Sequence, residues 1–152
     1  MLRLKIGDAF QICTDECVIL IHYVYDDARI GQMVRVLSRR LSQEATDFDV
    51  VVRAKEDFTV FFPLKAAARQ GIVKRIGHYE IPHSFCRPER MRVKHSVGRE
   101  TQGWYIVDVD SWQREFVHDL TKDQVALSPW GVWNDTLLIE RVCGGWTLET
   151  WS

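Results

Sequence analysis

The sequence predicts a mainly β (α+β) fold, a small SH3-like barrel or rolled antiparallel sheet with two short helices. Short runs of β-branched and aromatic residues recur along the chain and are joined by tight polar turns, which is typical of such folds. Only two segments carry helix end signals. At 152 residues, 46% apolar and 27% charged, the chain matches one soluble domain spanning residues 1–152.

The N-terminal part is predicted to be a series of strands. Alternation over residues 2–13, around a bend at Gly7, indicates two of them. Residues 18–25, VILIHYVY, have the clearest strand pattern in the chain, and the turn at 26–31 makes residues 32–37 its hairpin partner.

The middle of the chain is predicted to add three strands, at residues 48–54, 58–62 and 72–76. Both helices are marked by their ends. Residues 64–70 follow Pro63 and precede a glycine, which predicts about two helical turns. A second, shorter helix is predicted at the spacing of Thr121 and Gln124, which is that of a capping box.

The C-terminal third is predicted to contain two hairpins. Residues 104–109 have a strand pattern, with residues 112–117 as the partner strand. Residues 136–142 and 146–151 flank a Cys-Gly-Gly turn, which indicates a closing hairpin. Within it, residues 137–139 are interpreted as a buried strand.

The cysteines and the apolar segments indicate a reduced, cytoplasmic protein. No apolar run reaches the ~18 residues of a membrane span, and the N-terminus has no apolar signal region. The four cysteines are therefore expected to be reduced rather than paired. Cys13 and Cys17, with His83 and Cys86, include the ligand types of a zinc site, but their spacing matches no tight signature. We expect no metal and no cofactor.

Charge is unevenly distributed although the net charge is −1. Residues 63–99 carry nine Lys or Arg against two acidic residues, and residues 108–152 carry eight acidic residues against three basic ones. Either segment can steer a charged partner. The basic 85–99 segment supplies the alternative prediction, a small-barrel module that binds nucleic acid. Its candidate residues are Arg87, Arg90, Arg92 and Lys94. The sequence pI near 6.5 argues against a dedicated nucleic-acid binder.

Catalytic signatures are weak. Asp108 and Asp110 would share one face of a strand, where paired carboxylates can hold a metal or shift each other's pKa. A strand-ending turn into Ser111 is the favoured interpretation, because Asp hydrogen-bonds locally in turns. The histidines form no HExxH pattern, and no GxSxG elbow is present. We predict no catalytic residue; a hydrolase centred on Asp108 or Asp110 is the third hypothesis.

The tryptophans offer the best candidates for a binding surface. Trp104, Trp112 and Trp146 lie in strand patterns and are predicted to be core. Trp130 and Trp133, in a turn, are either core residues or interface anchors, since tryptophan is enriched in binding hot spots. The candidate partner-binding residues are therefore Trp130, Trp133, Asn134, Asp135 and Glu140.

Five motifs, taken in order, resemble one known family. They are KIGDAFQI (5–12), FFPLKAA (61–67), GWYIVD (103–108), LSPWGVWNDTLLIE (127–140) and GGWTLETW (144–151). The chain resembles the bacterial polymorphic-toxin immunity proteins of the "immunity protein 26" type over nearly its whole length. The resemblance implies a non-enzymatic cytoplasmic protein that binds and neutralises a cognate toxin domain encoded nearby. The opening Gly7, Asp8 and Phe10 imply an SH3-like barrel start. Because immunity proteins vary at their contact surface, the shared motifs mark the fold more than the toxin site.

Overall fold

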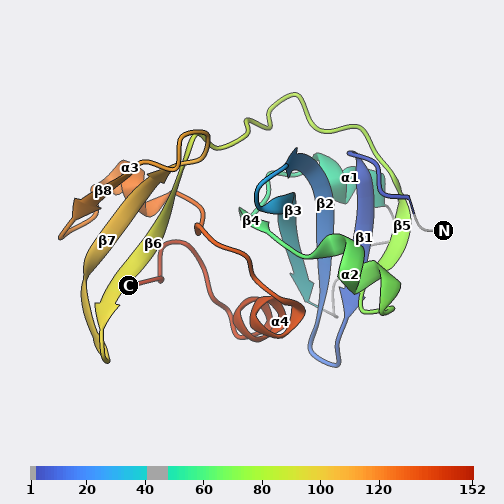
Figure 1. Ribbon diagram of the computed structural model, residues 1–152. Coiled ribbons are helices and arrows are strands. Elements are labelled where there is room, and N and C mark those ends of the chain that lie inside the picture. Colours follow the sequence, from blue (N-terminus) through green and yellow to red (C-terminus); the bar gives the residue numbers. More distant parts are fainter. Residues whose placement is uncertain (1–2, 41–47) are drawn as a thin grey trace.

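The computed structural model describes residues 3–40 and 48–152, which form two antiparallel sheets and four short helices (Figure 1). The mainly β prediction is confirmed. In chain order the elements are β1 (Asp8–Cys13), β2 (Cys17–Asp27), β3 (Gly31–Arg40), α1 (Phe48–Arg53), β4 (Phe58–Phe61), α2 (Leu64–Arg69), β5 (Lys74–His78), β6 (Arg90–Val97), β7 (Glu100–Asp108), β8 (Arg114–Val117), α3 (Lys122–Val125) and α4 (Asp135–Cys143).

The larger sheet has the strand order β4-β3-β2-β1-β5. Its centre is the predicted hairpin of β2 and β3, in which Ile21 pairs with Val36. The edge strands β4 and β5 do not pair with each other, so the sheet is open. This agrees with the rolled-sheet form of the prediction rather than with a closed barrel.

The smaller sheet has the strand order β6-β7-β8, with β8 as the predicted partner of β7. Trp104 at its centre lies opposite Lys94 on one side and Val117 on the other. Figure 1 shows this sheet beside the larger one, with the segment between β5 and β6 arching over both and the C-terminal segment running between them.

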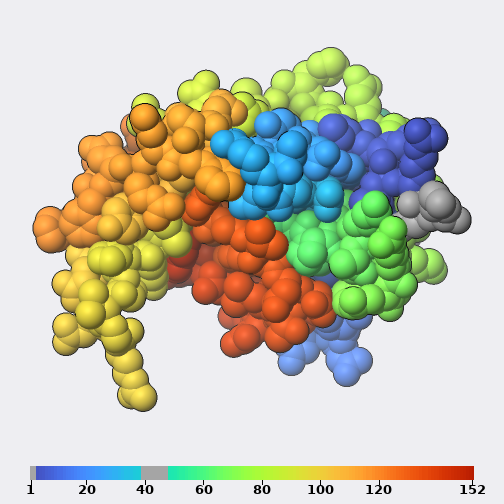
Figure 2. All heavy atoms as spheres, viewed as in Figure 1, coloured from blue at the N-terminus to red at the C-terminus, as the bar shows by residue number. Residues whose placement is uncertain are grey.

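Within the described part of the chain, three apolar clusters pack the elements against one another. The largest lies between one face of the five-stranded sheet and helices α2 and α4, and it includes Phe10 and Leu138. A small cluster on the opposite face packs Leu20 against Val51 of α1. The third joins the two sheets through Phe61 and residues that include Met91 and Val109. The space-filling view accordingly shows one continuous body (Figure 2).

Two predicted strands are helices. Residues 48–54 contain α1, because the neighbouring Val51 and Val52 both become buried when the segment turns as a helix against the sheet. Residues 136–142 lie in α4, and residues 146–151 form no strand, so the predicted closing hairpin is wrong. Asn134 explains α4: its side chain accepts a hydrogen bond from the Leu137 amide at the helix N-terminus.

The predictions for the two helices are confirmed, and those for the remaining strands are confirmed in part. Helix α2 lies where it was predicted, and α3 has the complete capping box of Thr121 and Gln124. Of the two strands predicted at residues 2–13, the second is β1; residues 3–7 form no strand, and residue 2 lies outside the described part of the chain. The segment predicted at 72–76 appears as β5, two residues later. Over the described ranges, no helix has the length and apolar character needed to span a membrane.

Candidate functional site

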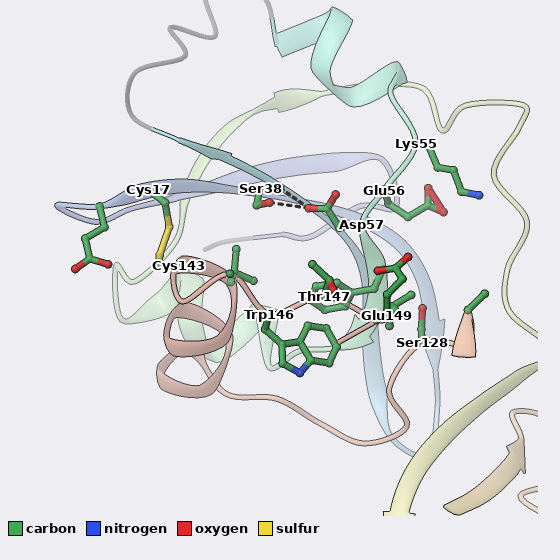
Figure 3. Close-up of a pocket in the computed structure, with 16 residues that line it drawn as sticks. Cys17, Ser38, Lys55, Glu56, Asp57, Ser128, Cys143, Trp146, Thr147 and Glu149 are labelled. Atoms are coloured by element: carbon green, nitrogen blue, oxygen red, sulfur yellow. Dashed lines mark hydrogen bonds between the residues drawn. A yellow bond between two sulfur atoms is a disulfide. The ribbon is translucent and has the colours of Figure 1, made fainter. Parts of the chain in front are cut away.

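An open groove of about 1240 Å³ runs between the five-stranded sheet and the C-terminal segment (Figure 3). We call it the acidic groove, because four carboxylates line it against a single ammonium group. Its charged residues are Glu16, Lys55, Glu56, Asp57 and Glu149. In Figure 3 the Cys17–Cys143 pair lies at one end and Lys55 and Ser128 lie toward the other.

Aromatic side chains form the inner wall of the groove. Trp146 is half-buried, and its ring meets the Phe58 ring edge-on, with centroids 5.1 Å apart. Trp133 supports Trp146 from behind at 5.1 Å, and the Arg141 guanidinium lies 4.6 Å from the Trp133 ring centre. The wall is therefore a packed and rigid surface.

Two of the four carboxylates are held in place by neighbouring groups. The Glu56 carboxylate lies 3.4 Å from the guanidinium of Arg35, whose side chain is buried and also donates to the Val52 and Ala54 carbonyls. Asp57 accepts hydrogen bonds from the amide and hydroxyl of Ser38, at 3.0 and 2.7 Å. Glu16 and Glu149 are exposed. Part of the negative charge is thus preorganised toward the groove.

Buried Arg92 fixes the other wall, the C-terminal segment. Its guanidinium donates to four backbone carbonyls, those of Leu127, Val125, Leu148 and Trp151, at 2.6–3.2 Å. It also lies 4.5 Å from the ring centres of Trp104 and Trp151. Burial lowers the pKa of Arg92 to about 10, so the side chain is still charged near neutral pH. Arg92 is therefore structural, and its prediction as a nucleic-acid contact is wrong.

The remaining basic candidates do not make one exposed surface. Arg87 donates to both carboxylate oxygens of Asp110 at 3.1 Å and stacks on Tyr25. Lys94 is half-buried, with its ammonium 5.7 Å from the Trp104 ring centre. Of the four candidate residues only Arg90 is exposed.

The partner-binding candidates between Trp130 and Glu140 also do not form one exposed surface. Trp133 is 5% exposed and packs on Phe58, so it is a core residue and cannot serve as an interface anchor. Asn134 is occupied as the cap of α4. Asp135 is half-buried in the first turn of α4, and Glu140 is exposed on the same helix.

Trp130 instead belongs to a ring stack that joins the two sheets. It is half-buried and meets Phe61 and Trp112 edge-on, with centroids 6.0 and 5.8 Å away. Trp112 is 39% exposed, so its predicted core position is wrong. It has a positive φ of 63°, and the Arg29 guanidinium lies 4.5 Å from its ring centre. Because Arg29 also donates to the Val109 carbonyl, this stack fastens the two sheets together.

Asp108 and Asp110 form the predicted turn. Asp108 accepts hydrogen bonds from the amides of Ser111 and Asp110, at 2.8 and 3.0 Å; these bonds, that from Ser111 foremost, hold the pKa of Asp108 below its usual range. Asp110 is paired with Arg87. The turn interpretation is confirmed, and the two carboxylates have separate partners.

Cys17 and Cys143 form a disulfide, contrary to the expectation of reduced cysteines. Their Cα atoms are 5.8 Å apart, although 126 positions separate them in the chain. Cys13 and Cys86 are free and exposed. Within residues 3–40 and 48–152 no group of three or more His, Cys, Asp or Glu side chains is placed to hold a metal ion.

Sequence reasoning missed the acidic groove because its lining comes from distant segments. Glu16 precedes β2, Glu56 and Asp57 precede β4, and Glu149 follows α4. The acidic excess of residues 108–152 did not locate it, because only Glu149 of the four groove carboxylates lies there. No model of a known protein family, no curated protein and no solved structure matches the chain.

Proposed function

We propose that the chain is a non-enzymatic binding protein that neutralises a bacterial toxin domain by holding a segment of it in the acidic groove. The observation that carries the proposal is the groove itself, an open channel with four carboxylates and an aromatic wall. The resemblance to immunity proteins supplies the class of partner.

The groove has the features of a protein-contact surface. Carboxylates along an open channel attract Lys and Arg side chains and accelerate encounter with a basic partner. Glu56 and Asp57 are already oriented, which lowers the entropy lost on binding. Trp146 is half-exposed in the groove wall, and we assign to it the role of aromatic contact residue that the sequence had suggested for Trp130 and Trp133.

Such contacts can inhibit a toxin by binding alone, without any reaction catalysed by this chain. A toxin that acts on nucleic acid needs a basic cleft, and acidic groups presented to that cleft compete with its substrate. The nucleic-acid-binding alternative for this chain has less support, because Arg92 is buried and Arg87 is paired with Asp110.

Co-expression with the product of the neighbouring gene tests the proposal. We expect a 1:1 complex and protection of the host cell. The variant Glu16→Gln/Glu149→Gln removes two exposed groove charges and should weaken the complex, most clearly at low salt. The matched control, Asp135→Asn/Glu140→Gln, removes two charges from α4 outside the groove.

The proposal has two ways to fail. Absence of both a complex and protection would refute toxin neutralisation. Loss of binding in the α4 variant, with unchanged binding in the groove variant, would place the contact on α4 and refute the role of the groove.

A further inference from the structure

We propose that Cys17 and Cys143 form a reversible thiol–disulfide site that controls the shape of the acidic groove. This inference rests on the function proposed above, because it assigns a regulation to the same site. Both cysteines line the groove, and their bond joins the first residue of β2 to the last residue of α4. Because Cys143 is only half-buried, an external thiol can reach this bond, which is the condition for reversible exchange.

The two sulfur atoms differ in access. Cys17 is 7% exposed, whereas Cys143 is half-buried at the open end of α4. The hydroxyl oxygen of Thr14 lies 3.8 Å from the Cys17 sulfur and 3.6 Å from the Cys143 sulfur. An external thiolate therefore reaches Cys143 more readily, and the Thr14 hydroxyl can donate a hydrogen bond to the Cys17 thiolate that leaves.

The exchange is balanced with a dithiol reductant. Its thiolate attacks the Cys143 sulfur, a mixed disulfide forms, and the Cys17–Cys143 bond breaks as Cys17 leaves as a thiolate. The second thiol of the reductant then displaces Cys143. The reductant ends as a disulfide, and its two protons end on Cys17 and Cys143. A small-molecule disulfide reverses the reaction.

Reduction should change the groove without unfolding the chain. Leu138 is fully buried and Asn134 caps α4, and neither depends on the sulfur atoms. After Cys143, however, only a two-glycine turn precedes Trp146 and the groove wall. Once the bond is broken, the end of α4 and this turn are held by backbone hydrogen bonds such as that from the Trp146 amide to the Arg141 carbonyl. Trp146 stays packed on Phe58 and Trp133, and Leu148 stays bonded to Arg92, so the freedom gained is confined to the last turn of α4 and to Gly144 and Gly145 at this end of the groove.

Thiol counting and hydrogen exchange test the site without any partner. Alkylation of the denatured, air-oxidised protein should modify two cysteines, and treatment with dithiothreitol should raise the number to four. The amides of Gly144 and Gly145, which bond to carbonyls in the last turn of α4, should exchange faster after reduction, while β7 amides, in the centre of the small sheet, should be unchanged. The variant Cys17→Ser/Cys143→Ser should exchange like the reduced protein in both conditions. The control Cys13→Ser/Cys86→Ser should keep the redox response.

The affinity for a hexa-arginine peptide, measured by fluorescence anisotropy, then tests whether the redox state of the two cysteines changes binding in the groove. We expect the reduced protein to bind at least about fivefold more weakly than the oxidised one, the lower end of typical coupling between two sites. Four modifiable thiols under every oxidising condition, or exchange and binding that are identical in both states, would overturn the redox inference. Failure of the oxidised protein to bind the peptide would instead count against the groove as a binding site, and the exchange data would still decide the redox inference.

Discussion

Replacement of Arg92 by methionine tests the side chain that holds the C-terminal segment through four hydrogen bonds. Methionine keeps much of the length and apolar character of the side chain but removes the guanidinium. Four backbone carbonyls of the C-terminal half then lose their donor at once. The two tryptophan rings beside the guanidinium also lose a cation.

The magnitude follows from the net contribution of hydrogen bonds to a charged donor. They contribute ~1.5 kcal/mol each at the lower end of the usual range, a value that already includes the removal of the donor from water, so the four together give about 6 kcal/mol. Burial lowers the pKa of Arg92 to about 10, which shows that the charge is held inside at a cost. The loss expected for Arg92→Met is therefore about 3 to 6 kcal/mol, with the lower figure applying where the freed carbonyls regain water.

Urea unfolding of the oxidised protein, followed by circular dichroism, measures this change. Arg90→Met is the matched control, since Arg90 lies on the same strand but is exposed, and it should change stability by less than about 0.5 kcal/mol. Equal unfolding midpoints and slopes for the two variants would show that the guanidinium does not anchor the C-terminal segment.

Three further predictions use the same assay. Burial, aided by the charge of Arg35, lowers the pKa of His22, so the folded chain keeps this histidine neutral while the unfolded chain binds a proton below pH ~6.5. Stability should be constant just above that pH and fall below it by at most ~1.4 kcal/mol per pH unit; a His22→Gln variant with the same slope would contradict this. Asn134→Ala should cost about 1 kcal/mol through loss of the α4 cap, with a near-neutral Thr136→Ala as its control. At Trp112, where φ is positive, glycine should be about 1 kcal/mol less destabilising than alanine, and the reverse order would argue against backbone strain there.

Local signals in the sequence were sufficient for much of the fold. The β2–β3 hairpin was predictable because segments rich in β-branched and other apolar residues flank a polar turn, and α3 because its capping box is contained in four residues. The same signals misassigned α4. Leu137, Leu138 and Ile139 form an apolar run that fits a strand as well as a helix, and the deciding residue is Asn134, a cap three positions earlier.

The candidate site was less predictable, because burial depends on distant contacts. Nothing near Arg92 in the sequence distinguishes it from exposed Arg90, since its partners lie 33 to 59 positions away. Trp133 and Trp130 are three positions apart, yet one is buried in the main core and the other lies at the junction of the sheets. Cys17 and Cys143 are 126 positions apart, a distance over which spacing rules carry no information.

The anchoring of the C-terminal segment has a consequence for the order of events during synthesis. The carbonyls of Leu148 and Trp151 complete the shell around Arg92, and Cys143 completes the covalent link to β2. All strands of both sheets precede these residues in the chain. A nascent chain can therefore pair its strands on the ribosome, but the arginine on the inner face of the small sheet lacks two of its four carbonyl partners until residues 148–151 emerge. The docking of the C-terminal segment on the small sheet is a late step that forms long-range contacts, and such steps are slow. During this interval Trp104 and Arg92 are open to water and to other chains.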